Sequence, residues 1–147
     1  MILYILSTFF IISFFCVLFI KLVNYNIFLR GINVIIEKLK AKIHRATVTE
    51  ADLNYIGSLT LDEDLMNASN IREFEKIQVL DITNGNRIET YVIRGKRGTG
   101  QVCINGAAAH LVSKGDLVII AAYCTLDVAG LNDFSPSIVH VNEYNKM

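Results

Sequence analysis

The sequence predicts a mainly β protein with a single core. Short stretches of alternating apolar and polar residues recur between positions 43 and 141, turn residues separate them, and the helical patterns among them are brief. Many short strands within about 110 residues indicate a closed barrel or a sandwich, and periodicity alone does not distinguish the two. The length of 147 residues and the hydrophobic content of 52% suit one domain with a well-filled interior.

The first of these strands is expected over residues 43–49, where residue type alternates. Alternation places Lys42, His44, Ala46 and Val48 on one face and Ile43, Arg45, Thr47 and Thr49 on the other. We therefore expect Lys42 and His44 to point the same way.

A short helix is expected over residues 63–69. Asp62 can cap it, because an aspartate at this position accepts hydrogen bonds from the N–H groups of the first turn. Glu63 and Asp64 lie in that first turn, where negative charge complements the helix dipole. The pattern therefore predicts a helix that begins directly after Asp62.

The chain then returns to strand over residues 71–82 and reverses. Asn84-Gly85 predicts a hairpin, since both residues tolerate the positive φ of a tight primed turn. Alternation on the returning strand gives one face with Arg87, Glu89, Tyr91 and Ile93 and another with Ile88, Thr90 and Val92. Arg87 and Tyr91 share a face but lie about 13 Å apart, at a rise of about 3.3 Å per residue.

The remainder of the chain is expected to continue in short elements. Turns are expected at 98–100 and 114–116, strands at 102–104, 117–123 and 138–141, and one helical turn at 107–111. The sequence shows no internal repeat and no low-complexity tract.

Residues 1–33 differ from the rest of the chain. In residues 1–20 all but Ser7, Thr8 and Ser13 are apolar and the first charge is Lys21, so this run predicts an N-terminal apolar helix long enough to anchor the chain in a membrane. Basic residues follow it, which by the positive-inside bias places the rest of the chain in the cytoplasm. No basic residue precedes the run, which disfavours a secretory signal.

Cysteine, histidine and charge usage argue against several other classes. The three cysteines lack a C-x-x-C spacing, which indicates a reducing compartment, and the three histidines lack zinc-ligand spacing, so we expect no metal. Residues 34–147 carry 12 Lys and Arg against 14 Asp and Glu, with no dense basic patch. We therefore expect no nucleic-acid partner.

Several separated motifs occur in a distinctive order. They read KIHRATVTEADL at 42–53, NYIGSLT at 54–60, TNGNR at 83–87, TY at 90–91, NGAAAH at 105–110 and GDLVII at 115–120. From about residue 34 to its end, the chain resembles the aspartate 1-decarboxylases, pyruvoyl-dependent enzymes that make β-alanine.

This resemblance implies a six-stranded double-psi β-barrel with short helices over residues 34–147, cut by the protein itself between Gly57 and Ser58. In the uncut zymogen, the Ser58 hydroxyl attacks the Gly57 carbonyl, and elimination of the resulting ester leaves a pyruvoyl group in place of Ser58. That cofactor converts L-aspartate to β-alanine and CO2 through a Schiff base, which supplies pantothenate and coenzyme A synthesis. The implied assembly is a homotetramer with active sites between subunits.

The resemblance also implies roles for individual residues. Ser58 forms the Schiff base as the pyruvoyl group, Tyr91 donates a proton to the product, and Thr90 assists the cut. Lys42 and Arg87 bind the substrate carboxylates. The other implied site residues are Asn105, Gly106, Ala107 and Ala108, which line the site, and His44 and Tyr55, which lie near it.

Alternatives remain open at this point. An uncut Gly57-Ser58 loop would fit a membrane-tethered binding module, and a cut that frees Ser58 would fit a hydrolase with an N-terminal nucleophile. Taken singly, Lys42, Arg87 and Tyr91 are ordinary surface or core-edge residues. Residues 1–33 also allow a second interpretation, in which they are not translated. The resemblance begins near Val34, where a GTG codon would start translation. Contact with a membrane is therefore expected only if residues 1–20 are translated.

Overall fold

The computed structural model of this chain describes Lys21 and residues 34–147. The apolar helix expected over residues 1–20 lies outside these residues. Within the described part of the chain, no helix is long and apolar enough to cross a bilayer. Residues Ile35–Met147 form one compact unit.

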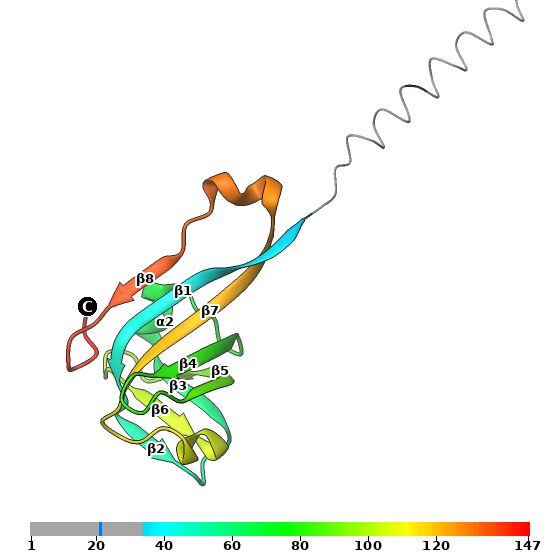
Figure 1. The fold of residues 1–147 in the computed structure, drawn as a ribbon. Helices are drawn as coiled ribbons and strands as arrows, with labels where there is room; N and C mark the ends of the chain where they lie inside the picture. Colours follow the sequence, from blue (N-terminus) through cyan, green and yellow to red (C-terminus); the bar gives the residue numbers. More distant parts are fainter. Residues whose placement is uncertain (1–20, 22–33) are drawn as a thin grey trace, which may run out of the picture. The chain divides into compact units, whose positions relative to one another are not determined.

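Strands dominate this unit, which confirms the predicted mainly β class (Figure 1). Eight strands form one hydrogen-bonded sheet in the order β2, β6, β3, β5, β4, β7, β1 and β8. Their bounds are β1 Ile35–Thr47, β2 Glu50–Asp52, β3 Ser58–Asp62, β4 Lys76–Asp81, β5 Arg87–Gly95, β6 Val102–Asn105, β7 Leu117–Asp127 and β8 Ser137–His140. The helical elements are α2 Glu63–Ser69, η1 Gly106–His110 and η2 Val128–Asp133.

The sheet closes on itself at the short break between β1 and β2. There the Thr49 N–H donates to the Val102 carbonyl of β6 at 2.8 Å, and the Val48 N–H donates to the Asp116 carbonyl at 2.9 Å. Counting β1 with β2 as one interrupted strand, the ring has six members, and β8 lies outside it along β1. The ring agrees with the six-stranded double-psi barrel expected from the sequence.

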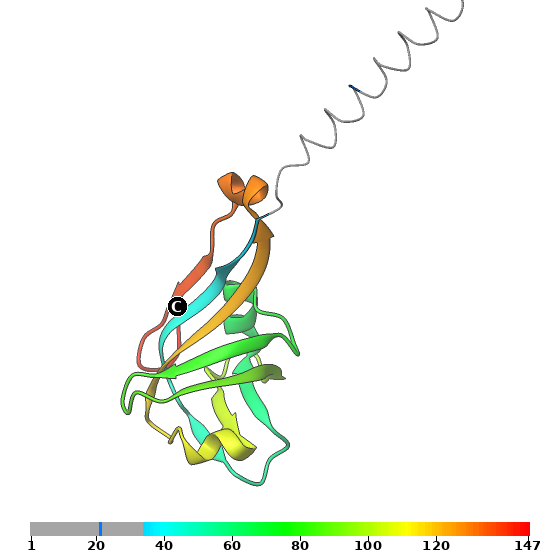
Figure 2. The ribbon, with the colours of Figure 1, turned by 45° about the vertical axis from the view of Figure 1, so that its right-hand side comes forward.

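The two longest strands, β1 and β7, run antiparallel side by side (Figures 1 and 2). Their register shifts beside Arg45, whose φ is 62°. A bulge of this kind turns the side chains that follow it to the other face. Lys42 and His44 keep a common outward face, but Ala46 and Val48 are buried in the core, so the predicted common face of all four was wrong.

The chain reverses between β4 and β5 as expected, but through a wider loop. The loop spans residues 82–86, and within it Gly85 has a positive φ of 83° whereas Asn84 does not. The Asp81 carboxylate accepts the N–H groups of Thr83 at 2.8 Å and Asn84 at 3.3 Å. The predicted two-residue primed turn was wrong, because this carboxylate organises a longer turn.

The strand predicted over residues 71–82 is also shorter, since β4 begins at Lys76. Before it, the Glu75 N–H donates to the Arg72 carbonyl at 3.1 Å in a turn where Phe74 has a φ of 63°. β3 was not predicted at all. Its five residues are all buried, and a strand covered on both faces has no alternation to read.

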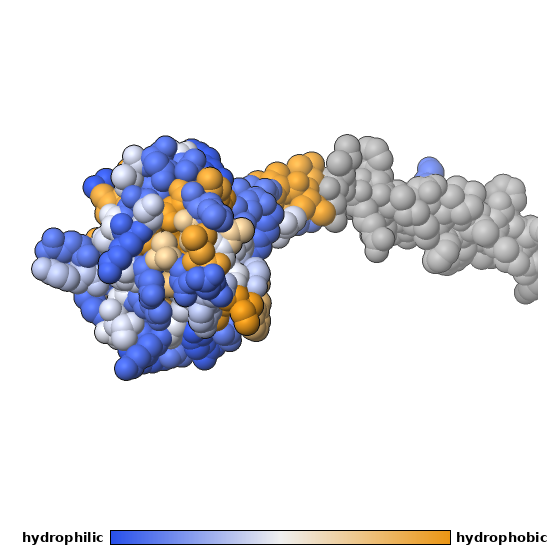
Figure 3. All heavy atoms as spheres, turned by 90° about the horizontal axis from the view of Figure 1, so that it is seen from below, coloured by the Kyte–Doolittle hydropathy of each residue, from blue (hydrophilic) through white to orange (hydrophobic). Residues whose placement is uncertain are grey.

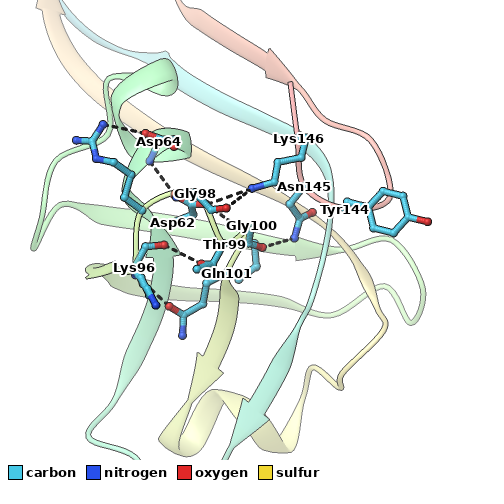
Figure 4. A network of polar contacts seen from close by, with 12 residues as sticks. Asp62, Asp64, Lys96, Gly98, Thr99, Gly100, Gln101, Tyr144, Asn145 and Lys146 are labelled. Carbon is cyan, nitrogen blue, oxygen red and sulfur yellow. Dashed lines mark hydrogen bonds and ion pairs between the residues drawn. The ribbon is translucent and has the colours of Figure 1, made fainter.

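The helix α2 occupies the predicted residues, and its cap belongs to a larger network (Figure 4). The Asp62 carboxylate accepts the N–H of Asp64 at 2.9 Å and those of Gly98 and Gly100 in the turn before β6. Burial raises the pKa of Asp62, but these three donors and the nearby Lys146 charge outweigh it and hold the pKa below its usual value. Asp62 therefore ties the end of β3 to the turn and the C-terminal segment.

Candidate active site

The Gly57-Ser58 pair lies in strained backbone at the start of β3. Gly57 has a φ of 45° and Ser58 a φ of 77°. Glycine adopts such angles readily, whereas a serine there costs about 1–3 kcal/mol. Ser58 is only 5% exposed, and its hydroxyl has no hydrogen-bond partner among the described residues. Strain and a buried unpaired hydroxyl on one residue indicate a functional position.

A cleft of about 300 Å³ opens beside this pair. Its volume is at the lower end of the range for small-molecule sites. Its walls come from β3, β5, β6 and η1 and consist of Gly57, Ser58, Ile88, Glu89, Thr90, Asn105, Ala107, Ala108 and Leu111. The fold thus brings six of the site residues expected from the sequence to one cleft, from four separate elements. Ile88, Glu89 and Leu111 were not expected there.

Gly106, at the start of η1, touches the backbone that precedes Ser58. Its φ is 60°, and a Cβ on it would lie 3.3 Å from Gly57 Cα and 3.4 Å from the Tyr55 carbonyl oxygen. The same Tyr55 carbonyl accepts the Gly57 N–H at 2.8 Å, while the Tyr55 side chain is 53% exposed. Gly106 therefore permits an approach that a side chain would disturb.

Asn105 faces Ser58 across the antiparallel β3–β6 pair. Its buried amide donates to Thr60 Oγ1 at 2.8 Å and accepts from the Cys103 thiol at 3.0 Å. Burial, and after it the charges of two carboxylates on β2, raises the pKa of Cys103 to about 11, so the thiol keeps the proton it donates. Thr60 and Cys103 were missed by sequence reasoning, because only strand pairing brings them to the amide.

Tyr91 reaches the pair from β5. From Arg87 to Val92 exposure alternates as predicted, with Tyr91 exposed and Thr90 half-buried in the cleft lining, but Ile93, predicted on the face of Tyr91, is half-buried and Arg94 is exposed. A Cβ on Gly57 would lie 3.5 Å from the Tyr91 hydroxyl oxygen, and the Tyr91 ring lies 6.4 Å from that of Phe74 between centroids. Two consecutive β5 residues therefore approach the Gly57-Ser58 pair.

Lys42 and Arg87 are not brought to this cleft within one chain. Lys42 pairs with Ala121, Ala121 with Gln78 and Gln78 with Glu89, which lines the cleft. β1 and β5 are therefore three positions apart in the six-member ring, on opposite sides of it, and Lys42 lies on the outward face of β1 and outside the cleft lining. Arg87 is exposed at the first position of β5 and is absent from the lining.

Comparison with known proteins agrees with this arrangement. Residues 34–147 match the sequence profile of the family described as aspartate decarboxylase. The chain belongs to this family. It is 59% identical over 113 residues to the aspartate 1-decarboxylase of Caldicellulosiruptor saccharolyticus, which covers 77% of this chain and 88% of the relative. It is 55% identical over 112 residues to that of Clostridium botulinum, with 76% and 88% covered.

A third relative gives the same result. The chain is 59% identical over 109 residues to the aspartate 1-decarboxylase of Acetivibrio thermocellus, which covers 74% of this chain and 86% of the relative. The family match spans residues 34–147, and the three alignments cover 86–88% of the relatives' lengths, so family membership applies to the whole barrel.

His44 of this chain, like Lys42, lies on the outward face of β1. Its ring meets that of His140 on β8 edge to face, with centroids 5.3 Å apart, and its Nδ1 is buried with no hydrogen-bond partner among the described residues. Burial, and then the charges of Lys42, His140 and Arg45, lowers the pKa of His44. The imidazole is therefore largely neutral at neutral pH.

The end of the barrel that carries β2 and β6 exposes apolar surface. Figure 3 views this end and shows hydrophobic residues grouped near its middle, with hydrophilic residues around them. Leu53 and Ile56, which follow β2, are 51% and 87% exposed, and Leu111 after η1 is 46% exposed. Grouped apolar surface of this kind is typical of protein contacts.

Proposed function

We propose that this chain is a self-processing decarboxylase that converts L-aspartate to β-alanine and CO2, with a pyruvoyl group made from Ser58. The observation that carries the proposal is the buried, unpaired Ser58 hydroxyl next to strained Gly57 at the wall of a cleft. Membership of the aspartate decarboxylase family supports the reaction and the substrate.

Ser58 supplies the nucleophile for the cut. Its Oγ bonds to the Gly57 carbonyl carbon, the bond from that carbon to the Ser58 nitrogen breaks, and the hydroxyl proton passes to the nitrogen. Loss of the Ser58 α-proton then expels the Gly57 carboxylate and leaves a dehydroalanine. Water replaces its nitrogen, which leaves as ammonia, and a pyruvoyl group remains at position 58.

The residues around position 58 fit such a group. The pyruvoyl carbonyl would supply an electron sink for the loss of the substrate α-carboxylate. Ala107 and Ala108 keep the facing wall small, so the cleft leaves room for a compact amino acid. Asn105, held by Thr60 and Cys103, keeps a fixed amide opposite position 58. Thr90 faces the same space and assists the cut.

Tyr91 supplies the proton that the α-carbon needs after decarboxylation. A phenol is a suitable general acid toward a carbanion, and its hydroxyl already approaches Gly57. We assign Arg87, which lies outside the lining of its own chain's cleft, to a substrate carboxylate through paired hydrogen bonds, and Lys42 to a second positive charge. Since Lys42 lies on β1, across the ring from β5 and outside the lining of its own chain's cleft, we assign it to the cleft of a neighbouring subunit.

This assignment places the sites between subunits, in the homotetramer that the family resemblance implies. The exposed apolar residues Leu53, Ile56 and Leu111 supply surface for such contacts. We further propose that residues 34–147 are the catalytic unit and act in the cytoplasm, without a metal. The alternatives for residues 1–33, a membrane anchor or an untranslated extension, are separated by the intact mass of natively expressed protein.

The direct test is an assay of purified protein with L-aspartate. β-Alanine and CO2 should appear in equal amounts, and Ser58→Ala protein should form neither. Activity in the Ser58→Ala variant, or none in fully cut wild-type protein, would overturn the proposal.

A further inference from the structure

The turn before β4 holds an aromatic residue in a strained conformation. Phe74 has a φ of 63° and is 71% exposed. A bulky side chain is rare in this backbone region and costs about 1–3 kcal/mol there, whereas glycine or asparagine adopts it readily. Burial of the ring therefore does not account for a phenylalanine at this position.

The Phe74 ring contacts Tyr91. The ring centroids are 6.4 Å apart with a tilt of 46°, within the range of favourable aromatic pairs. The backbone fixes this approach, because the Phe74 N–H donates to the Val92 carbonyl at 2.8 Å and the Val92 N–H donates to the Glu75 carbonyl at 3.1 Å. Phe74 is thus attached to β5 one residue beyond Tyr91.

The same turn is anchored to β1 from its other side. Lys40 Nζ lies 2.6 Å from Glu75 Oε1 and 2.7 Å from Oε2, with side chains only 22% and 18% exposed. Glu75 Oε2 also accepts the Arg72 N–H at 2.8 Å. A half-buried ion pair and a hydrogen bond within the turn together hold Phe74 in place.

We propose that Phe74 is a positioning residue for Tyr91: its ring holds the Tyr91 side chain so that the phenol remains beside Gly57 before the cut and beside the substrate afterwards. An exposed tyrosine on a strand otherwise exchanges between rotamers. A displacement of a catalytic group by about 1 Å can cost about 10²-fold in rate. This inference rests on the proposed role of Tyr91 as proton donor.

Phe74→Asn tests the inference because it removes the ring and relieves the backbone strain together. Stability to urea should stay the same or rise, while kcat per cut subunit should fall about 10-fold or more with little change in KM. Phe74→Tyr, which keeps a ring, should restore wild-type kcat. Tyr144→Asn is the matched control, since Tyr144 is also 71% exposed, and it should leave kcat unchanged.

Two further measurements connect the effect to Tyr91. In a Tyr91→Phe background, Phe74→Asn should lower kcat no further. The 19F resonance of 3-fluorotyrosine at position 91, assigned by its loss in Tyr91→Phe, should shift or sharpen in Phe74→Asn as the ring gains freedom. An unchanged resonance, or kcat falling only in step with stability, would overturn the inference. If Tyr91→Phe keeps wild-type kcat while the Tyr91 resonance changes in Phe74→Asn, the proton-donor role is rejected and the positioning role is retained.

Discussion

Gly106 packs its backbone directly against Gly57, so closely that a Cβ on Gly106 would lie 3.3 Å from Gly57 Cα. The contact joins η1, which forms one wall of the cleft, to the residue whose carbonyl the Ser58 hydroxyl is proposed to attack. The position of that carbonyl therefore depends on a residue 49 places further along the chain.

Gly106→Ala should slow the cut by about 3-fold or more, because the added methyl requires Gly57 to move by a few tenths of an ångström and a shift of about 1 Å costs about 10²-fold. Gly85→Ala is the matched control. Gly85 also has a positive φ, of 83°, but a Cβ there would meet nothing within 4 Å. The appearance of the 58–147 fragment on denaturing gels measures both rates. Equal slowing in the two variants would show that backbone strain, and not the contact, is responsible.

Protonation of Asp62 should lower the free energy of unfolding in acid. Its pKa lies below the usual value of 3.8 because the N–H donors and Lys146 outweigh the effect of burial. A carboxylate whose pKa is lowered on folding makes its full contribution to the free energy of unfolding above its unfolded pKa. That contribution is lost as pH falls through its pKa in the folded state. Below about pH 4, the free energy of unfolding should therefore decline.

Asp62→Asn measures this contribution. At pH 7 the variant should be less stable by about 1–3 kcal/mol, because N–H groups lose a charged acceptor. The difference from wild type should shrink as pH falls below about 4. Urea denaturation between pH 3 and 7 gives both values. Parallel curves across this range would contradict the role assigned to the Asp62 network.

The sequence predicts elements that local rules control and misses those that tertiary contacts decide. The helix α2 follows from the Asp62 cap, and the two faces of β5 between Arg87 and Val92 follow from alternation. The bulge at Arg45 breaks the alternation of β1 at a residue that favours no such conformation. β3 has no alternation because both of its faces are covered.

The candidate site divides in the same way. Gly57, Ser58 and Thr90 belong to motifs whose order along the chain indicates their chemistry, and the fold places them at one cleft. Thr60 and Phe74 carry no such signal, since their partners Asn105 and Tyr91 reach them only through strand pairing and an aromatic contact. Residues that position others are thus harder to find from sequence than residues that react.

Shared active sites can be tested with two inactive variants. Lys42→Ala and Ser58→Ala, expressed together, should regain part of the decarboxylase activity, because a cut Lys42→Ala chain can receive Lys42 from a Ser58→Ala neighbour. Co-expression of a Ser58→Ala chain with a Thr90→Ala chain should give no activity, since both residues line the cleft of one chain. No recovery in the first pair, at a subunit ratio confirmed by mass, would place Lys42 in its own chain's site or outside any site.

The central claim is that Ser58 becomes the pyruvoyl terminus of a cut chain, and denaturing mass spectrometry of the purified protein tests it most directly. The prediction is a 90-residue fragment spanning residues 58–147. Its N-terminus should react with a hydrazine and lack an amine. Ser113→Ala should give the same fragment and Ser58→Ala none. A 58–147 fragment with a free serine amine, or a chain that stays intact after long incubation, would contradict the account.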